Sequence, residues 1–245
     1  MIYLREIRLP VLPEASYAGK IPAVRFLHET GGMKFEKPVT FLVGENGTGK
    51  STLLEAIAVA MGFPPEGGPK EFTFSTRDTH SELSGYLKLI RTIPPEDGFF
   101  LRAESLYNAA SYLDDSGSLL TRYGGRSLHG QSHGESFLAI VTNRFEGNGL
   151  YLLDEPEAAL SPQRQLSLLA AVHELVKKNA QFIIATHSPI LMSYPDGEIK
   201  ELSERGIQTV PYRETDHYRL TRDFLNGPER MLRLLLEDGR GEGRE

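Results

Sequence analysis

The chain has 245 residues, of which 40% are hydrophobic and 24% are charged, and its formal net charge is −6. This composition is typical of a folded globular protein and excludes disorder along most of the chain. The negative charge does not indicate a nucleic-acid partner, which would need a local basic patch. Cysteine is absent, which excludes a disulfide framework, cysteine-type zinc and iron–sulfur sites, and a cysteine nucleophile.

Apolar runs in the sequence are too short to cross a bilayer, which takes about 20 residues, and Arg5, Glu6 and Arg8 interrupt the first ten positions. We therefore expect neither a signal peptide nor a membrane span, and we expect a cytoplasmic protein. The predicted organisation is one domain over 1–245, with an inserted helical subregion at 75–148 and a disordered tail at 239–245.

The first third of the chain predicts mainly short strands. Apolar residues favour strands in three segments, which are 2–9, 23–27 and 38–43. A helix is expected from Lys50 to about Met61, and the following proline and glycine pairs stop it. From 72 to 102, strand signals alternate with turns, which indicates a small and less regular β layer.

The second half predicts a regular alternation of strands and helices. Helices are expected over 103–114 and 134–145, on either side of a polar loop at 116–130. The apolar runs 150–153 and 182–185 favour buried strands. Since unbroken apolar strands joined by helices are typical of parallel sheets, we predict an α/β fold with helices on both faces of a mostly parallel sheet.

Helix-start signals define the remaining elements. Ser161 followed by Pro162 predicts a helix that continues to Lys178, because the serine caps the helix and proline needs no amide donor there. Beyond Ile199, two short strands and two further helices are expected, at 215–226 and 228–237. Their arginines have acidic neighbours, which favours a solvated surface.

The segment after the strand at 38–43 fits the phosphate-binding loop pattern of glycine, four residues, glycine, lysine, and serine or threonine. It comprises Gly44, Glu45, Asn46, Gly47, Thr48, Gly49, Lys50, Ser51 and Thr52. Successive backbone amides and a helix N-terminus would converge there on one anion. Lys50 would reach the β and γ phosphates, and Ser51 would bind Mg²⁺. The alternative is a glycine-rich turn with an exposed lysine.

Two acids follow the apolar strand at 150–153. Open parallel sheets bind ligands at the carboxyl ends of their strands, where Asp154 and Glu155 are expected. Asp154 would complete the Mg²⁺ site, and Glu155 would polarise an attacking water. Alone, the two acids would be read as a solvated turn, and their pairing with the Lys50 loop favours the catalytic interpretation.

His187 ends the next apolar strand and is expected at the same sheet edge. Its imidazole could bond the γ phosphate and the attacking water. A histidine after a strand is commonly a satisfied polar residue, so this prediction depends on the neighbouring motifs.

A further motif precedes the helix at 134–145. Ser132 and Glu135 fit a capping box, and the Ser132 hydroxyl with the Gly134 amide would form a second phosphate site at the helix N-terminus. One chain offers one nucleotide to its own loop, so this second site would be useful chiefly across a dimer.

In their order along the chain, the four motifs resemble those of the ATP-binding cassette (ABC) ATPases. The segment 132–135 resembles the cassette signature, and 154–162 resembles the soluble branch near RecF, SMC and OLD-type ATPases. More closely, the motifs are similar to small bacterial predicted AAA/ABC-like ATPases. The resemblance implies a P-loop NTPase fold with a small antiparallel β layer and a helical signature subdomain, and it implies ATP and Mg²⁺ as cofactors.

The sequence departs from the cassette pattern at three points. Cassettes carry a coupling glutamine after the second strand, and none lies between Lys50 and Gln131, so Ser75, Thr76 or Asp78 would replace it. Ser161 stands where an aspartate is usual. The aromatic residue that would stack on adenine is unassigned among Phe35, Phe26 and Tyr17.

The leading hypothesis is a soluble ATPase that closes head to tail as an ATP-dependent homodimer and acts on an unknown protein partner. The alternative is the ATP-binding subunit of an ABC transporter with a separate membrane permease, which the missing glutamine and Ser161 disfavour. A nucleotide-sensing module without turnover stays open. An OLD-type nuclease lacks room for its second domain, an SMC-type bridge lacks heptads, and a kinase would not need the signature.

Overall fold

The computed structural model of the protein describes residues 1–13, 16–70, 82–103 and 132–237. The strands in these ranges are β1 (Leu4–Arg8), β2 (Met33–Lys34), β3 (Val39–Val43), β4 (Gly68–Pro69), β5 (Lys88–Arg91), β6 (Asp97–Arg102), β7 (Gly149–Asp154), β8 (Gln181–Ala185), β9 (Glu198–Ser203) and β10 (Gly206–Thr209). The helices are α1 (Pro22–Thr30), α2 (Lys50–Ala60), α4 (His133–Arg144), α5 (Pro162–Lys177), α6 (Pro189–Met192), α7 (Asp216–Asn226) and α8 (Pro228–Glu237). Short 3-10 turns are η1 (Tyr17–Lys20), η2 (Glu82–Tyr86), η5 (Pro156–Ala158) and η6 (Tyr212–Glu214).

The main sheet has the strand order β10-β9-β3-β8-β7-β6-β4. The neighbours from β9 to β6 are parallel, and only the edge strands β10 and β4 pair antiparallel. This arrangement confirms the predicted mostly parallel sheet. Because β3, β8 and β7 are adjacent and parallel, the phosphate loop, His187 and the acids at Asp154 and Glu155 meet at one edge of the sheet.

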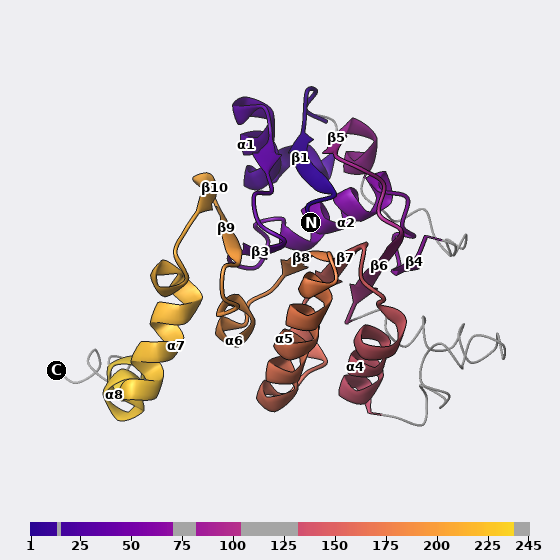
Figure 1. The fold of residues 1–245 in the computed structure, drawn as a ribbon. Coiled ribbons are helices and arrows are strands. Elements are labelled where there is room, and N and C mark those ends of the chain that lie inside the picture. Colours follow the sequence, from indigo (N-terminus) through magenta and orange to yellow (C-terminus); the bar gives the residue numbers. More distant parts are fainter. Residues whose placement is uncertain (14–15, 71–81, 104–131, 238–245) are drawn as a thin grey trace.

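Helices cover both faces of the main sheet (Figure 1). On one face, α1, α2 and the antiparallel sheet β2-β1-β5 enclose one hydrophobic core. On the other face, α4, α5 and α6 enclose a second core. Every residue of β3, β7 and β8 is buried. This burial explains why these strands read as unbroken apolar runs in the sequence.

A buried glutamine joins the antiparallel sheet to the main sheet. Gln181 begins β8, and its Oε1 accepts hydrogen bonds from the backbone amides of Tyr3 at 2.7 Å and Leu4 at 2.9 Å. Its Nε2 donates to the carbonyl of Leu4 at 2.9 Å. The side chain is 0% exposed, so these bonds satisfy groups that would otherwise be buried without partners.

The strand predicted at 23–27 is wrong, because these residues lie in α1. Pro22 occupies the first turn, where proline favours a helix. The buried side chains of α1 are Ala23, Val24 and Leu27, which share one face at helical spacing. The small helix α6 was not predicted. The helix expected at 103–114, the loop at 116–130 and the tail at 239–245 fall outside the described residues.

The other predicted elements agree with the structure. The helices at 50–61, 134–145 and 161–178 correspond to α2, α4 and α5, and Ser161 caps α5 by accepting from the amide of Arg164. The segment 75–148 contributes β5, β6 and α4 in its described part. Its treatment as an inserted subregion stays a prediction.

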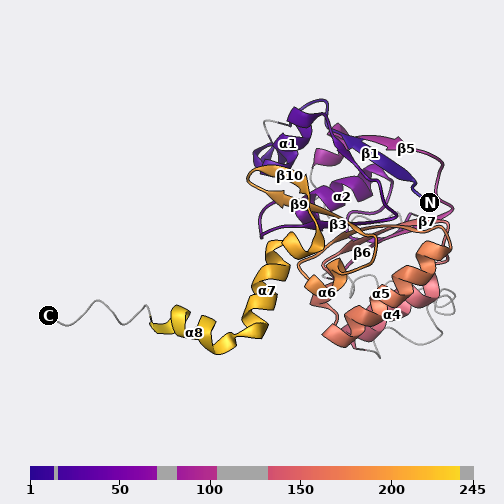
Figure 2. The same ribbon diagram turned by 60° about the vertical axis from the view of Figure 1, so that its left-hand side comes forward.

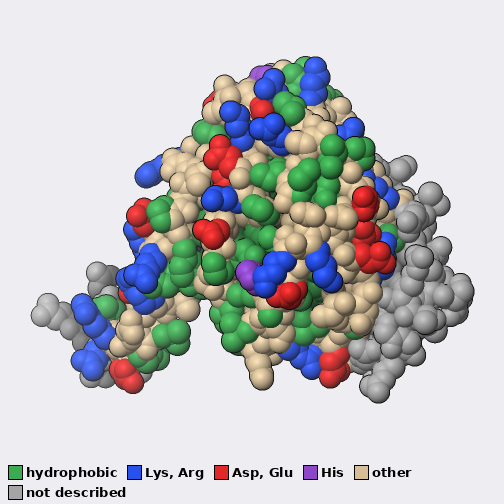
Figure 3. All heavy atoms as spheres, in the orientation of Figure 1, with side chains coloured by type: hydrophobic (Ala, Val, Ile, Leu, Met, Phe, Trp, Pro, Cys, Tyr) green, Lys and Arg blue, Asp and Glu red, His purple; other side chains and the backbone are tan. Residues whose placement is uncertain are grey.

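The two C-terminal helices extend away from the body of the protein (Figure 2). No residue of α7 is buried, and Leu220, Leu225 and Leu235 are each more than half exposed. On the face seen in Figure 3, acidic and basic side chains are interspersed, as expected for a solvated surface. In the described part of the chain, no helix has both the length and the apolar character of a membrane span.

Candidate functional site

The loop between β3 and α2 has the backbone that its glycines allow. Gly44, Gly47 and Gly49 have φ angles of 141°, 83° and 100°, and residues other than glycine rarely adopt such values. At Gly44 space is also limited, because a Cβ there would lie 2.1 Å from the carbonyl oxygen of Leu202 on β9. The loop is therefore packed against the sheet and leads directly into α2 at Lys50.

Lys50 lies within this loop. The residue is 4% exposed, and its Nζ donates to the carbonyl oxygens of Gly44 at 2.8 Å and Glu45 at 3.0 Å. Burial lowers its pKa, and the nearby carboxylates of Glu155 and Asp154 oppose this shift. The ammonium group is thus held at the carboxyl edge of the sheet, where a phosphate group would replace the loop carbonyls as its partner.

Ser51 and Asp154 meet across the site, although they are far apart in the sequence. The hydroxyl of Ser51 on α2 donates to Oδ1 of Asp154 at the end of β7, at 2.9 Å. A hydroxyl and a carboxylate are oxygen ligands of the kind that Mg²⁺ uses beside substrate phosphates. In the described ranges there is no cluster of three or more acidic, histidine or cysteine side chains suited to a metal.

Arg102 is a charged residue of this site that the sequence did not reveal. It ends β6, and the register places it opposite Asp154. Its Nε lies 3.4 Å from Oδ2 of Asp154, and its Nη1 lies 2.8 Å from Oε2 of Glu55 on α2. The only sequence signal was its place after an apolar strand, which did not distinguish it from the chain's other arginines.

Glu155 is the second acid of the strand end, and it has a left-handed backbone with φ 47°. Its amide donates to the carbonyl of Ala185 on β8, which fixes the turn. Oε1 of Glu155 lies 3.6 Å from Nε2 of His187, which is too long for a hydrogen bond. The structure therefore brings the two predicted catalytic side chains close together at the same edge of the main sheet. Such backbone strain is common at functional sites.

His187 is held by two residues that sequence reasoning missed. Its backbone amide donates to the carboxylate of Glu157, which also accepts from the hydroxyl of Thr186 at 2.7 Å. Its Nδ1 lies 3.0 Å from Nε2 of His217 on α7. Burial lowers the pKa of His187, and the charge of Lys50 and the His217 ring add to the shift. The net shift favours the neutral form of the imidazole, although the carboxylates of Glu155 and Glu45 oppose it.

The sequence contains a pattern that could have indicated Glu157 as a site residue, and it contains none for His217. Glu157 belongs to the same acidic run as Asp154 and Glu155, so its place near the site could have been expected. Burial raises the pKa of Glu157. His217 lies at the start of a C-terminal helix, and no sequence pattern connects it with His187.

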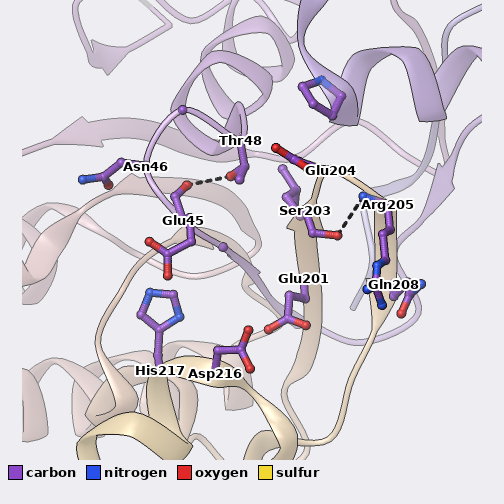
Figure 4. Close-up of a pocket in the computed structure, with 14 residues that line it drawn as sticks. Glu45, Asn46, Thr48, Glu201, Ser203, Glu204, Arg205, Gln208, Asp216 and His217 are labelled. Atoms are coloured by element: carbon purple, nitrogen blue, oxygen red, sulfur yellow. Dashed lines mark hydrogen bonds between the residues drawn. The ribbon is translucent and has the colours of Figure 1, made fainter. Parts of the chain in front are cut away.

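A cavity of about 670 Å³ lies beside the phosphate loop. The loop forms one wall, the β9–β10 hairpin forms another, and the start of α7 closes it (Figure 4). In that view the side chains of Glu45 of the loop and His217 of α7 point toward one another. Its volume lies within the range of small-molecule sites. The lining side chains with polar groups include Asn46, Thr48, Ser203, Arg205, Gln208 and Asp216.

The signature segment at 132–135 forms the predicted capping box. Ser132 and Glu135 bond one another's backbone and side chains at the start of α4. Arg164 of α5 donates to the Ser132 hydroxyl at 3.0 Å and pairs with Glu135 at 3.1 Å. In the described part of the chain, the side-chain hydrogen bonds of Ser132 and Glu135 go to one another and to Arg164, the Ser132 carbonyl accepts from Ser136, and none of these bonds goes to the phosphate loop.

The candidates for an adenine-stacking residue are separated by burial. Phe35 is 2% exposed and belongs to the core, and Phe26 packs under Gly206. Tyr17 in η1 is 75% exposed and is the most exposed of the three. The three proposed replacements for the coupling glutamine, Ser75, Thr76 and Asp78, fall outside the described residues.

Two family models match the chain. Residues 23–96, which include the phosphate loop, match a model described as an AAA domain. Residues 136–192, which include Asp154, Glu155 and His187, match one described as an AAA ATPase domain. The fold is similar to that of a putative metal-chelate type ABC transporter in an inward-facing conformation, with a TM-score of 0.51, 15% identity, and coverage of 90% of this chain and 88% of that chain.

Two further solved structures are similar at lower scores. A bacterial ABC transporter cassette, determined as a dimer, has a TM-score of 0.46 and 15% identity over 75% of this chain and 90% of that chain. The SMC head domain from Thermotoga maritima has a TM-score of 0.42 and 17% identity over 74% and 92%. The two family matches, the order of the motifs and the strand topology together support an ABC/AAA-like P-loop ATPase, and the first of these solved structures shares its fold.

Proposed function

We propose that the protein binds ATP with Mg²⁺, hydrolyses it to ADP and phosphate, and uses this cycle as a head-to-tail homodimer switch. The observation that carries the proposal is the hydrogen bond between Ser51 and Asp154. It joins the phosphate loop to the acidic strand end, with Glu155 and His187 beside it. Phosphoryl transfer depends mainly on positioning and charge stabilisation, and these residues can supply both.

Each residue has a separate role in the proposed reaction. The loop amides and Lys50 bind the phosphates, and Ser51 and Asp154 hold the metal. Bound Mg²⁺ would neutralise charge on the phosphates. Glu155 accepts a proton from water as the water oxygen bonds to the γ phosphorus and the bond to the leaving ADP oxygen breaks. His187, whose lowered pKa favours the neutral form, positions the same water or a γ-phosphate oxygen.

The dimer follows from where the signature segment lies. Ser132 is exposed at the helix N-terminus and Gly134 is buried beside Ala159 and Arg164, and within the described ranges no hydrogen bond joins this segment to the loop of the same chain. A second chain rotated by a two-fold axis would bring each signature segment to the other chain's loop. Two nucleotides would then be held between the protomers, and hydrolysis would release them.

The test of the proposed activity is Mg²⁺-dependent phosphate release. The parent should release phosphate from ATP, and Lys50→Ala should abolish release because it removes the buried ammonium group. Lys37→Ala is the matched control, because Lys37 is an exposed lysine before the other end of β3. Glu155→Gln should bind ATP and lose about 10²-fold or more in turnover. Parental turnover in Lys50→Ala would contradict the site.

A further inference from the structure

The magnesium-binding carboxylate already has a cation beside it. Nε of Arg102 lies 3.4 Å from Oδ2 of Asp154, while the Ser51 hydroxyl bonds Oδ1 at 2.9 Å. The two oxygens of one carboxylate therefore have different partners. The side chains of Arg102 and Asp154 are only 19% and 6% exposed. A carboxylate so buried needs a counter-charge to stay ionised.

A second carboxylate shares the same guanidinium. Nη1 of Arg102 lies 2.8 Å from Oε2 of Glu55 and 3.2 Å from the carbonyl of Pro65. Glu55 is one helical turn after Ser51 on α2. Arg102 therefore pairs with two acids at once. One is Asp154, and the other is Glu55, which lies on the same helix as Ser51.

We propose that Arg102 is the resident counter-cation of Asp154 and competes with Mg²⁺ for it, while Glu55 retains the guanidinium when the metal binds. The inference rests on the proposed function, because it places Mg²⁺ with ATP at Ser51 and Asp154. The donor set fits the metal, and the guanidinium fits the same acid. Two cations at one carboxylate repel each other, and the repulsion is strong where water is largely excluded.

The competition predicts opposite effects for the two neighbours of the site. Removing the charge of Arg102 removes this cation as a competitor for Asp154, so coupling between Mg²⁺ and ATP should increase. Removing the charge of Glu55 leaves Arg102 committed to Asp154, so the coupling should decrease. A different role would be that Arg102 merely holds Asp154 in place. In that case loss of the Arg102 charge and loss of the Glu55 charge would both weaken the metal site, and the coupling would decrease in both variants.

The experiment measures the dissociation constant of a non-hydrolysable ATP analogue by calorimetry, once with EDTA and once with saturating Mg²⁺. An analogue is needed because the parent is proposed to hydrolyse ATP when Mg²⁺ is present. The dissociation constant with EDTA divided by the constant with Mg²⁺ reports the coupling, and a larger ratio means stronger coupling. Since both constants come from one variant, a general loss of ATP binding cancels. Relative to the parent, we expect the ratio to rise about tenfold in Arg102→Gln, to fall in Glu55→Gln, and to stay near the parental value in Arg102→Lys, which keeps the charge.

The outcomes separate this inference from the proposed function. A ratio that falls or stays unchanged in Arg102→Gln overturns the competition, and so does a rise in Glu55→Gln. An Arg102→Lys ratio that matches Arg102→Gln overturns it as well, because the charge would then not be the cause. A parent that binds no ATP under either condition refutes the proposed function, and the inference falls with it.

Discussion

Gly44 should be the glycine of the phosphate loop that is hardest to replace. An alanine Cβ at this position would lie 2.1 Å from the carbonyl oxygen of Leu202, and the φ angle is 141°. A backbone conformation that alanine rarely adopts costs about 1–3 kcal/mol, and overpacking against a rigid neighbour adds about 1–3 kcal/mol. The free energy of unfolding of Gly44→Ala should therefore fall by about 2–6 kcal/mol.

Gly47→Ala is the matched control, because its φ is 83° and a Cβ there meets nothing within 4 Å. Only the cost of the left-handed backbone applies, which is about 1–2 kcal/mol. Urea unfolding of both variants and the parent, followed by circular dichroism, measures the difference. If Gly44→Ala loses no more stability than Gly47→Ala, the close packing of the loop against β9 is refuted.

Two further predictions concern the signature segment and His187. Ser132→Arg should leave ATP binding to the loop intact and block ATP-driven dimerisation. Thr142→Arg, on an exposed part of the same helix, should dimerise normally. If the two variants behave equally in light scattering, Ser132 acts only as a helix cap. Because the pKa of His187 is lower in the folded protein than its ordinary value of 6.5, the unfolded chain binds more protons, and stability is lost as pH falls through 6.5. His187→Gln should reduce that loss in denaturation curves at about pH 7.5 and 5.5, and an unchanged loss would contradict a lowered pKa.

The parts of the site that could be predicted are those in which neighbouring residues carry the chemistry. Apolar strands lead into the phosphate loop, Asp154 and His187, and the parallel order of β3, β8 and β7 brings their carboxyl ends together. Local patterns also predicted the capping box at Ser132, since its bonds span only three positions.

The parts that could not be predicted depend on contacts between distant segments. Arg102 reaches Asp154 only because β6 pairs with β7, and His217 reaches His187 only because α7 packs near the sheet edge. The wrong strand at 23–27 has a different cause. A five-residue segment with four apolar residues and Arg25 is too short to distinguish helical from alternating spacing, and the helix depends on Pro22 and the face that the core covers.

The most direct test of the two-sided nucleotide site is the molar mass of Glu155→Gln in solution, measured by size-exclusion chromatography with light scattering. We predict a monomer near 27.3 kDa without nucleotide and with ADP, and about twice that mass with ATP and Mg²⁺. ADP should not suffice, because it lacks the γ phosphate that both protomers would bind. A mass near 27.3 kDa under all three conditions, with ATP bound, would contradict the proposed dimer.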